Sequence, residues 1–356
     1  MPHKILFFKG ENIVQLNCES NCGITNNMAN FIKNFNSIVK FNFSELNNKI
    51  ILESNINKGK FESENQLGYY LAGLIEGDGS IIVPLTNRNN KGKLLYPKIK
   101  FTFVKKDSPL ALKINKVLGG GTLEYPKKAN YLNLLIQDIP TIYKITLLIN
   151  GKMRTPKIEA LYKLIDWFNN RSENKKELIK LELDTSDLKN NAWLSGFLEA
   201  DGNFYSNYSI NREGIASSLK FYMRITQKSK YTKNNDSSKS EISFLPLMQK
   251  IADFLLVSKV KPIQRIKPNY TEEALEVRTV KRESCRKLIN YLLKYPLFSS
   301  KYLDFLCWSE IYDIYKSKIY KNLEGTNHLI FLKNNMNTSR TEFDWRHLDN
   351  FYKLKF

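Results

Sequence analysis

The most regular pattern along this chain is a strict alternation of apolar and polar residues in two segments, 98–104 (KIKFTFV) and 219–226 (LKFYMRIT). A period of two places one set of side chains on a covered face of a β-sheet and the other set on an open face. We therefore predict two antiparallel strands, each in a sheet that helices cover on one side only. The outward set is mostly cationic or aromatic: Lys98, Lys100, Lys220, Tyr222 and Arg224.

Both strands occupy the same place in a repeated order of predicted elements. A strand and a turn precede each of them, an amphipathic helix follows at 108–120 or 245–256, and two more strands lead to a closing helix at 156–168 or 300–315. Each half then reads helix, two strands, helix, two strands, helix. The predicted fold class is α+β, with two copies of one unit and antiparallel sheets.

The first helix of each unit carries nearly the same phrase, LAGLIEGDGS at 71–80 and LSGFLEADGN at 194–203. Small residues four positions apart form a strip on one helix face, where another backbone can approach closely. We predict that the two strips pack on each other. Their members are Gly73 and Gly77 in the first phrase and Gly196 and Ala200 in the second.

An aspartate and a glycine close each phrase. Gly79 and Gly202 suit the left-handed conformation that ends a helix, which places Asp78 and Asp201 at the two helix ends. If the helices pack side by side in the same direction, the two carboxylates meet beside the negative ends of two helix dipoles. That is unfavourable without a cation between them, and hard oxygen ligands indicate Mg²⁺, with Mn²⁺ as a substitute. Such a centre activates water beside a phosphate, so phosphodiester hydrolysis is the predicted chemistry.

Composition and charge narrow the class of partner. The 356 residues include 55 Lys+Arg against 35 Asp+Glu, a formal net charge of +20. This excess favours a polyanion, and no apolar run approaches the roughly 20 residues of a membrane span, so we expect nucleic acid and no membrane. A merely solvated strand face is the other interpretation of the outward residues. Basic residues in later predicted strands of the second half extend the predicted nucleic-acid surface: Arg265, Lys267 and Arg278.

Changes in composition divide the chain. Residues 1–65 lack sustained periodicity, so we expect a loosely ordered extension with room for one short helix. The two repeated units are assigned to 66–172 and 173–320, and residues 321–356 are taken as a C-terminal tail. The charged stretch 169–178 is the best linker candidate.

The cysteines indicate a reducing compartment. Cys18, Cys22, Cys285 and Cys307 are too few and too scattered for a disulfide framework in a chain of this length. The spacing of Cys18 and Cys22 could begin a zinc site, but no second cysteine pair follows and the chain has only 3 histidines. Two ordinary thiols explain the pair equally well.

Taken together, the two phrases resemble the defining motif of the LAGLIDADG homing endonucleases, in the single-chain form that carries two motifs as a pseudo-twofold pair. The resemblance covers about residues 66 to 320. It implies two αββαββα units packed through the motif helices, with saddle-shaped sheets that lie in the DNA major groove. The order of elements predicted above matches that plan.

The resemblance also implies a metal site at the motif acids. In that family the eighth motif residue binds the metal, which corresponds to Asp78 and Asp201 here. The carbonyls of the seventh residues, Gly77 and Ala200, would be further ligands. The sixth position holds glutamate in place of the commoner aspartate, and we interpret these glutamates as buried or interface carboxylates that hydrogen-bond across the seam. They are Glu76 and Glu199.

Four more residues match functional positions of the family. A polar residue at the end of the second strand orders water around the metal, and Lys105 and Gln227 occupy that place. A lysine before the closing helix lies near the scissile phosphate, which corresponds to Lys157 and Lys301. A surface lysine near a helix start is the other interpretation of these two.

The expected function is therefore that of a monomeric, site-specific homing endonuclease making a staggered double-strand break. A strand of ~10 residues spans ~33 Å, about one turn of duplex, so two halves would cover about 20 base pairs. The main alternative is an intron maturase that binds its own intron RNA, alone or as a second activity. A transcription regulator on this scaffold would have lost the acids or gained a DNA-binding domain. Composition and family habit indicate a gene expressed inside the mitochondrion, since no transit peptide is evident.

Overall fold

The computed structural model describes residues 4–9, 12–17, 64–171, 177–232, 241–267, 270–352 and 354. By its contacts the chain divides into two compact units, Met1–Ile56 and Asn57–Phe356. Within the first unit, β1 (Lys4–Lys9) pairs with β2 (Asn12–Asn17) in an antiparallel hairpin. The short helix expected in the N-terminal extension, and Cys18 and Cys22, fall outside the described residues.

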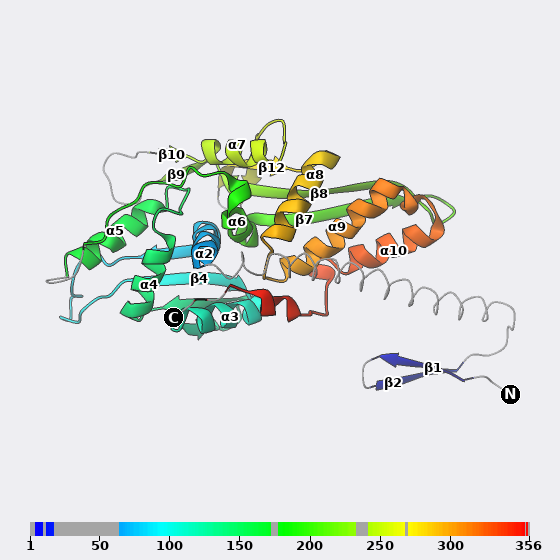
Figure 1. Cartoon of the computed structure of the whole chain (residues 1–356). Helices are drawn as coiled ribbons and strands as arrows, with labels where there is room; N and C mark the ends of the chain where they lie inside the picture. The colour runs from blue at the N-terminus through cyan, green and yellow to red at the C-terminus, as the bar shows by residue number, and fades with distance from the viewer. Residues whose placement is uncertain are drawn as a thin grey trace. The chain divides into compact units, whose positions relative to one another are not determined.

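The second unit holds both repeated halves (Figure 1). The first half contains α2 (Glu64–Asp78), β3 (Gly79–Ile82), β4 (Lys98–Val104), η1 (Lys105–Asp107), α3 (Ser108–Leu118), β5 (Thr122–Glu124), β6 (Tyr131–Ile136), α4 (Ile139–Ile149) and α5 (Ile158–Asn169). The second half contains η2 (Leu188–Asn190), α6 (Trp193–Asp201), β7 (Gly202–Ile210), β8 (Ala216–Lys228), β9 (Lys230–Thr232), β10 (Glu241–Ser243), α7 (Leu245–Phe254), β11 (Lys261–Ile266), β12 (Thr271–Arg278), α8 (Arg282–Lys294) and α9 (Lys301–Ser317).

Each half has two helices after its second pair of strands, where the sequence pattern predicted only one. The additional helices are α4 and α8. Isoleucine and threonine dominate α4, and such residues are typical of strands, which hides the helix in the sequence. A start signal is nevertheless present, because the Asp138 carboxylate accepts the Thr141 amide at 3.0 Å and Pro140 lies in the first turn.

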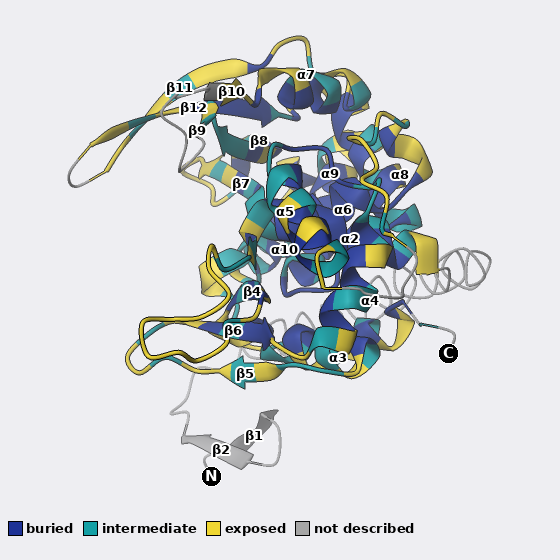
Figure 2. Ribbon diagram, turned by 90° about the vertical axis from the view of Figure 1, so that its left-hand side faces the viewer, coloured by how far each residue is buried: buried dark blue, intermediate teal, exposed yellow. Residues whose placement is uncertain are grey.

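Two four-stranded antiparallel sheets form the body of the unit. Their strand orders are β3-β4-β6-β5 and β11-β12-β8-β7. In β4 the predicted alternation is present, since Ile99, Phe101 and Phe103 are buried and Lys98 is exposed. Figure 2 shows the two sheets toward the same side of the molecule, above and below the buried helices α2 and α6. The sheets therefore present open faces on one side of a common seam.

Helices α2 and α6 pack side by side along this seam through their glycines. A Cβ atom on Gly73 would lie 2.1 Å from the Trp193 carbonyl, and one on Gly196 would lie 2.0 Å from the Tyr70 carbonyl. Four residues further along α2, Gly77 faces Ala200. The contacts advance in the same direction on both helices, so the helices run parallel and their C-terminal ends meet.

The glycines that close the motif helices have a different role from the predicted one. Gly202 has φ −77°, and Gly79 is not among the glycines with positive φ, so neither adopts the left-handed conformation. A Cβ atom on Gly79 would instead lie 2.5 Å from the Ile75 Cα, and one on Gly202 would lie 2.7 Å from the Leu198 carbonyl. The tight turn from helix to strand excludes a side chain, which is why glycine is needed there.

The C-terminal segment is packed as part of the second unit. It contains η3 (Ile319–Lys321), α10 (Leu323–Asn334), η4 (Asn337–Ser339) and η5 (Arg346–Asn350). Beyond η5, Phe351 and Tyr352 are buried against Tyr70 and Phe298, with ring centroids 4.8–5.7 Å apart. The predicted tail thus contributes aromatic side chains to the seam itself. Within the described residues, we find no helix both long and apolar enough to span a membrane.

Candidate active site at the ends of the motif helices

Asp78 and Asp201 are the last residues of α2 and α6, at the end of the seam where the helices meet. The Asp201 Oδ2 atom lies 3.7 Å from the position that a Cβ atom on Gly77 would occupy. Asp78 is exposed, whereas Asp201 is half-buried. Burial, and then the negative charge of Asp78, raise the pKa of Asp201 to about 6. The two carboxylates therefore lie close enough to repel each other, which is the condition that a bound cation relieves.

Two lysines cap the C-terminal ends of the motif helices. The Lys157 ammonium donates to the carbonyls of Ile75, Gly77 and Gly79 at 2.9–3.0 Å. A cation at this position compensates the negative end of the helix dipole. Burial lowers the pKa of Lys157, while the nearby carboxylates oppose that shift.

The second lysine repeats this arrangement. The Lys301 ammonium donates to the Leu198 carbonyl at 3.2 Å and to the Ala200 carbonyl at 2.8 Å. Its pKa is likewise lowered by burial and opposed by acids, including Glu199 and Asp201. The lysines thus bind the same seventh-residue carbonyls that the resemblance assigns to the metal, Gly77 and Ala200. A carbonyl oxygen has two lone pairs and can accept from a lysine and face a cation at once.

The ends of the second strands differ between the halves. Gln227 donates from Nε2 to Asp201 Oδ2 at 3.0 Å. Lys105, in the matching place, is exposed, and in the described part of the chain no side-chain partner of its ammonium is found. Asp201 is therefore oriented by a neutral amide, whereas Asp78 is exposed and Lys105 extends into solvent.

Glu76 ties the motif helix to the loop that carries Lys157. Its carboxylate accepts the amides of Arg154 and Thr155 at 2.7 and 2.5 Å, and the indole N–H of Trp193 in the other half at 2.5 Å. Burial raises the pKa of Glu76 to about 7, and these donors oppose the rise. The carboxylate thus hydrogen-bonds across the seam as the sequence suggested.

Glu199 has the corresponding role in the second half, where it holds the loop that carries Lys301. It accepts the Tyr70 hydroxyl from the first half at 3.0 Å, and also the amides of Phe298 and Ser299 in the loop before Lys301. Burial raises its pKa as well. Each sixth-position glutamate therefore fixes its own lysine-bearing loop and one aromatic side chain of the other half.

The candidate nucleic-acid residues fall into two groups. Exposed or half-exposed cations for which the described residues show no ion pair lie on the outward face of β4 and β8 or just after β11: Lys98, Lys100, Lys220, Arg224 and Lys267. Lys267 follows β11 rather than lying within a later strand as predicted. Arg265 and Arg278 are instead paired with glutamates of β12, Glu272 at 2.6 Å and Glu276 at 2.7 Å.

Tyr222 departs from the predicted exposed pattern. Its register opposite Tyr205 places it on the outward face, yet it is only 7% exposed. The two rings stack with centroids 4.6 Å apart, and the Arg278 guanidinium lies 4.3 Å from the Tyr222 ring centroid. Arg278 is therefore held between Glu276 and a stacked pair of rings. The sequence analysis missed Tyr205 and Glu276. The alternation of residues in β7 and β12 could have indicated that they share the outward face with Tyr222 and Arg278.

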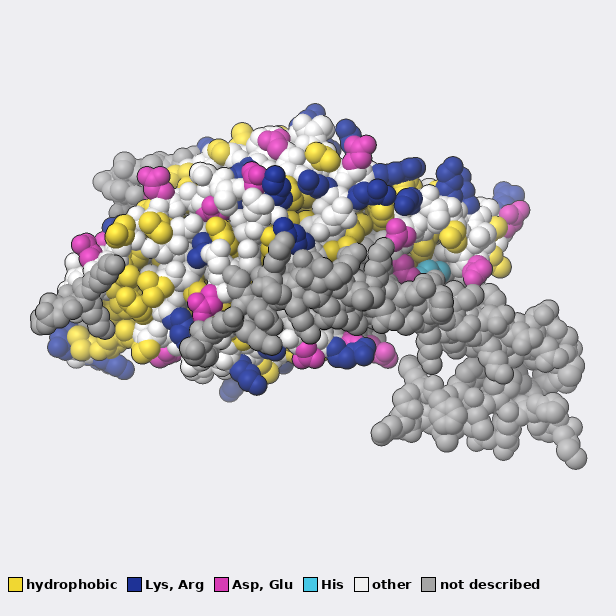
Figure 3. Space-filling view, viewed as in Figure 1, with side chains coloured by type: hydrophobic (Ala, Val, Ile, Leu, Met, Phe, Trp, Pro, Cys, Tyr) yellow, Lys and Arg dark blue, Asp and Glu magenta, His cyan; other side chains and the backbone are white. Residues whose placement is uncertain are grey.

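Basic side chains also gather away from the sheets. Figure 3 shows Lys and Arg side chains along its upper edge, over the region of α8 and α9 in Figure 1. Net charge alone therefore does not locate the nucleic-acid surface.

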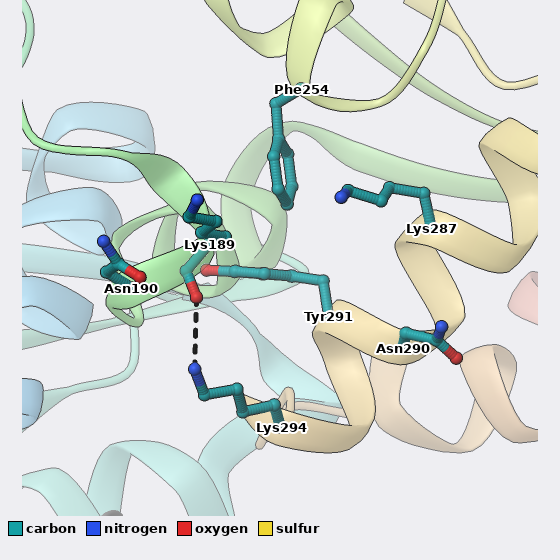
Figure 4. Close-up of a pocket in the computed structure, with 7 residues that line it drawn as sticks. All are labelled: Lys189, Asn190, Phe254, Lys287, Asn290, Tyr291 and Lys294. Atoms are coloured by element: carbon teal, nitrogen blue, oxygen red, sulfur yellow. Dashed lines mark hydrogen bonds between the residues drawn. The ribbon is translucent and has the colours of Figure 1, made fainter.

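A pocket of about 290 Å³ lies beside α8 (Figure 4). It is lined by Lys189, Asn190, Phe254, Lys287, Asn290, Tyr291 and Lys294. The Tyr291 hydroxyl bonds to the Asn191 carbonyl and the Ser195 amide, at the N-terminal end of α6. Asp201 lies at the other end of that helix, so the pocket is separate from the paired carboxylates.

The described residues contain no cluster of three or more Asp, Glu, His or Cys that could hold a metal ion. A cation at the seam would have the two motif carboxylates, with backbone carbonyls and water completing its shell. Cys285 and Cys307 are buried free thiols, and burial raises the pKa of each to about 11, which makes them inert packing residues.

Comparison with known proteins agrees with this architecture. The sequence model of the LAGLIDADG endonuclease family matches the chain twice, at residues 71–168 and 194–312. Intron-encoded DNA endonuclease aI3 of Saccharomyces cerevisiae is 31% identical over 331 residues, which cover 87% of this chain and 78% of that protein. The cox1 intron-2 37.2 kDa protein of Schizosaccharomyces pombe is 27% identical over 268 residues, which cover 75% of this chain and 72% of that protein.

Solved structures show the same fold. The I-LtrWI LAGLIDADG homing endonuclease, bound to its target DNA, aligns with a TM-score of 0.57 at 18% identity, over 78% of this chain and 100% of that one. At this identity the likeness concerns the fold: two motif units with antiparallel sheets around a seam of parallel helices.

Proposed function

Because this chain belongs to the LAGLIDADG endonuclease family, we propose that it cuts both strands of a long DNA site and needs a divalent cation to do so. The observation that carries the proposal is the meeting of Asp78 and Asp201 at the ends of parallel, touching helices. Two such acids beside two open sheets match the need of a duplex, which has one scissile phosphate on each strand. The DNA endonuclease named among the relatives favours this activity over the maturase alternative.

The residues at the seam fit a hard divalent cation, and we propose Mg²⁺ with Mn²⁺ as a substitute. Asp78 and Asp201 supply anionic oxygens, and burial together with the negative charge of Asp78 raises the pKa of Asp201, an unfavourable pairing that a bound cation would offset. Gly77 and Ala200 offer carbonyls at the same end of the seam. When bound, the cation would supply an activated water and offset charge on the phosphate.

The remaining residues of the centre hold these groups in place. Lys157 and Lys301 fix the two helix ends and keep positive charge beside the acids, where a scissile phosphate would lie. Gln227 orients Asp201, whereas Lys105 extends into solvent, within reach of water or phosphate. This difference supports unequal rates for the two strands.

The open sheet faces form the proposed DNA surface. Lys98, Lys100, Lys220 and Arg224 are available to phosphates and base edges. Arg278 is held by Glu276 and Tyr222, so its guanidinium is already aimed before DNA arrives, as bidentate recognition of a guanine requires. Arg265, held by Glu272, and Lys267 extend this surface along β11. Two halves of this size support a target of about 20 base pairs, read by a monomer.

The proposal is tested on a plasmid that carries the candidate intron-insertion site. Wild-type protein should linearise it with Mg²⁺ or Mn²⁺ and leave it uncut with Ca²⁺ or EDTA, with staggered ends on sequencing. Asp78→Asn and Asp201→Asn should each slow cleavage by more than roughly 100-fold, because each removes an anionic metal ligand. Asp349→Asn, at an exposed acid of η5, is the matched control and should cut normally.

Cleavage by wild type that persists in EDTA would refute the metal requirement. Undiminished cutting by either motif-acid variant would refute the roles proposed for the acids. We also propose that the gene lies in a mitochondrial intron, on the basis of the Asn- and Lys-rich composition and the intron-encoded relatives. Locating the reading frame in a nuclear gene would contradict this.

A further inference from the structure

A hydrogen bond joins a segment of the first centre to a segment of the second, and the two reciprocal segments have no such bond. Asp107, at the end of η1 in the first half, accepts the Ser300 amide of the second half at 2.8 Å. The carboxylate is only 6% exposed, and burial raises the pKa of Asp107 while the Ser300 amide and nearby lysines oppose the shift. Asp107 lies two residues after Lys105, and Ser300 immediately precedes Lys301. The bond therefore connects the strand end of one centre to the lysine loop of the other.

The loop before Lys301 depends on carboxylates from both halves. Glu199, in the motif helix of the same half, accepts the amides of Phe298 and Ser299. Asp107 accepts the next amide along, that of Ser300. Three successive N–H groups are thus satisfied by two buried acids. Removing Asp107 leaves a buried donor without a partner in the segment that positions Lys301.

The matching place in the other half cannot form this bond. Alignment of Lys157 with Lys301 puts Pro156 opposite Ser300, and proline has no N–H to donate. Alignment of Lys105 with Gln227 puts Ser229 opposite Asp107, so the second half has no carboxylate at this position. Ser229 uses its backbone to bond Glu273 and Phe244 within its own half. Both the donor and the acceptor are missing from the reciprocal arrangement.

We propose that Asp107 is a positioning residue for the centre that contains Lys301, through a contact from the first half that has no counterpart at the Lys157 centre. This inference rests on the proposed DNA cleavage. Without the bond, the Ser300 amide loses its acceptor although Glu199 still accepts the Phe298 and Ser299 amides, while the Lys157 loop keeps its proline and its own bonds to Glu76. The consequence is an unequal effect on the two DNA strands.

The test follows both strands of a duplex target labelled at each 5′ end, in single-turnover cleavage at saturating protein. The strand that belongs to each centre is assigned from Lys157→Met and Lys301→Met. Asp107→Ala should slow the Lys301 strand by about 10-fold or more, the loss expected for an unpaired buried donor, and the other strand by less than about twofold. Nicked DNA should accumulate. Asp107→Asn retains an oxygen acceptor and should restore the strand balance, and Ser229→Ala, the matched control, should behave as wild type.

A second variant removes the donor and leaves Asp107 untouched. Ser300 has φ −57°, which proline can adopt, and the first half already has proline at this place. Ser300→Pro should therefore fold and reproduce the strand bias of Asp107→Ala. An equal slowing of both strands, or none, in either variant would overturn the proposal.

Amide hydrogen exchange separates this inference from the proposed cleavage. Peptides covering residues 298–303 should exchange faster in Asp107→Ala than in wild type or Ser229→Ala, whether or not DNA is cut. Unchanged exchange would overturn the role of Asp107 in holding the loop. Wild-type cleavage together with balanced strands in Asp107→Ala would overturn the inference and leave the proposed function intact.

Discussion

Gly196→Ala tests the packing on which the whole active centre depends. The added Cβ atom would lie 2.0 Å from the Tyr70 carbonyl oxygen and 3.0 Å from the Leu74 amide nitrogen. Ordinary contact begins at 3.4 Å, so α2 and α6 must separate by about 1.4 Å, the difference between 3.4 and 2.0 Å. Both obstacles are backbone atoms, which cannot rotate away as a side chain can.

The magnitude follows from two opposing effects. Overpacking a tight contact costs ~1–3 kcal/mol, and the upper end applies because the obstacles are backbone. Alanine in a helix interior is favoured over glycine by about 1 kcal/mol, which offsets part of that cost. We expect a net loss of about 2 kcal/mol in the free energy of unfolding. We also expect a loss of DNA cleavage under conditions where the variant is folded, because the shift moves Asp201 away from Asp78.

Gly68→Ala is the matched control, because Gly68 lies where α2 packs on α4. Its Cβ atom would lie 2.2 Å from the Leu148 carbonyl of α4, a conflict of the same kind outside the seam. Urea unfolding should show a comparable loss of stability in both variants, whereas cleavage by folded protein should fall only in Gly196→Ala. Cleavage at the wild-type rate by folded Gly196→Ala would refute the reasoning.

Three further predictions concern the C-terminal segment and the second sheet. Tyr352→Ala should lower the free energy of unfolding by about 3 kcal/mol through the lost aromatic contacts, whereas Tyr352→Phe should be neutral because the buried hydroxyl finds no hydrogen-bond partner among the described residues. Calorimetry decides, and equal effects would contradict this account. Burial lowers the pKa of His347 below its usual 6.5, so the neutral ring stabilises the fold fully above about pH 6.5 and loses that contribution as the pH falls below it. His347→Gln should show a smaller change in urea midpoint between pH 7.5 and pH 5.5 than wild type, and an identical change would argue against the assignment. Glu276→Gln weakens the hold on Arg278 and should broaden base preference at adjacent target positions, measured by cleavage of single-substitution target libraries; an unaltered preference profile would speak against a positioning role.

The sequence by itself determined the parts of this protein that depend on local pattern. The alternation in β4 predicts its buried and open faces, because side chains on a strand point to opposite sides in turn. The repeated small residues predict the helix seam, because only a backbone without bulk allows another backbone so close. Asp78 and Asp201 stand out because the same acid closes both phrases. These features could be predicted without a structure because they are repeated within the chain.

Local pattern failed where several tendencies compete. The β-branched composition of α4 resembles a strand, and only its N-terminal Asp138 and its packing on α2 make it a helix. Tyr222 follows the outward alternation of β8, yet Tyr205 and Arg278 cover it. Gly202 was expected to need a left-handed conformation, whereas it is close contact with Leu198 that excludes a side chain.

Only the tertiary structure decided which distant residues meet. Nothing in the sequence around Tyr352 indicates that it packs on Tyr70, 282 positions earlier, because a long-range contact leaves no local period. The hydrogen bond between Asp107 and Ser300 spans 193 positions and both halves. Sequence repetition predicted two centres that differ at Lys105 and Gln227, and it left their relative efficiency open. The fold brings an acid of the first half to the lysine loop of the second and offers no matching bond in return, a difference between the two centres that only the tertiary structure reveals.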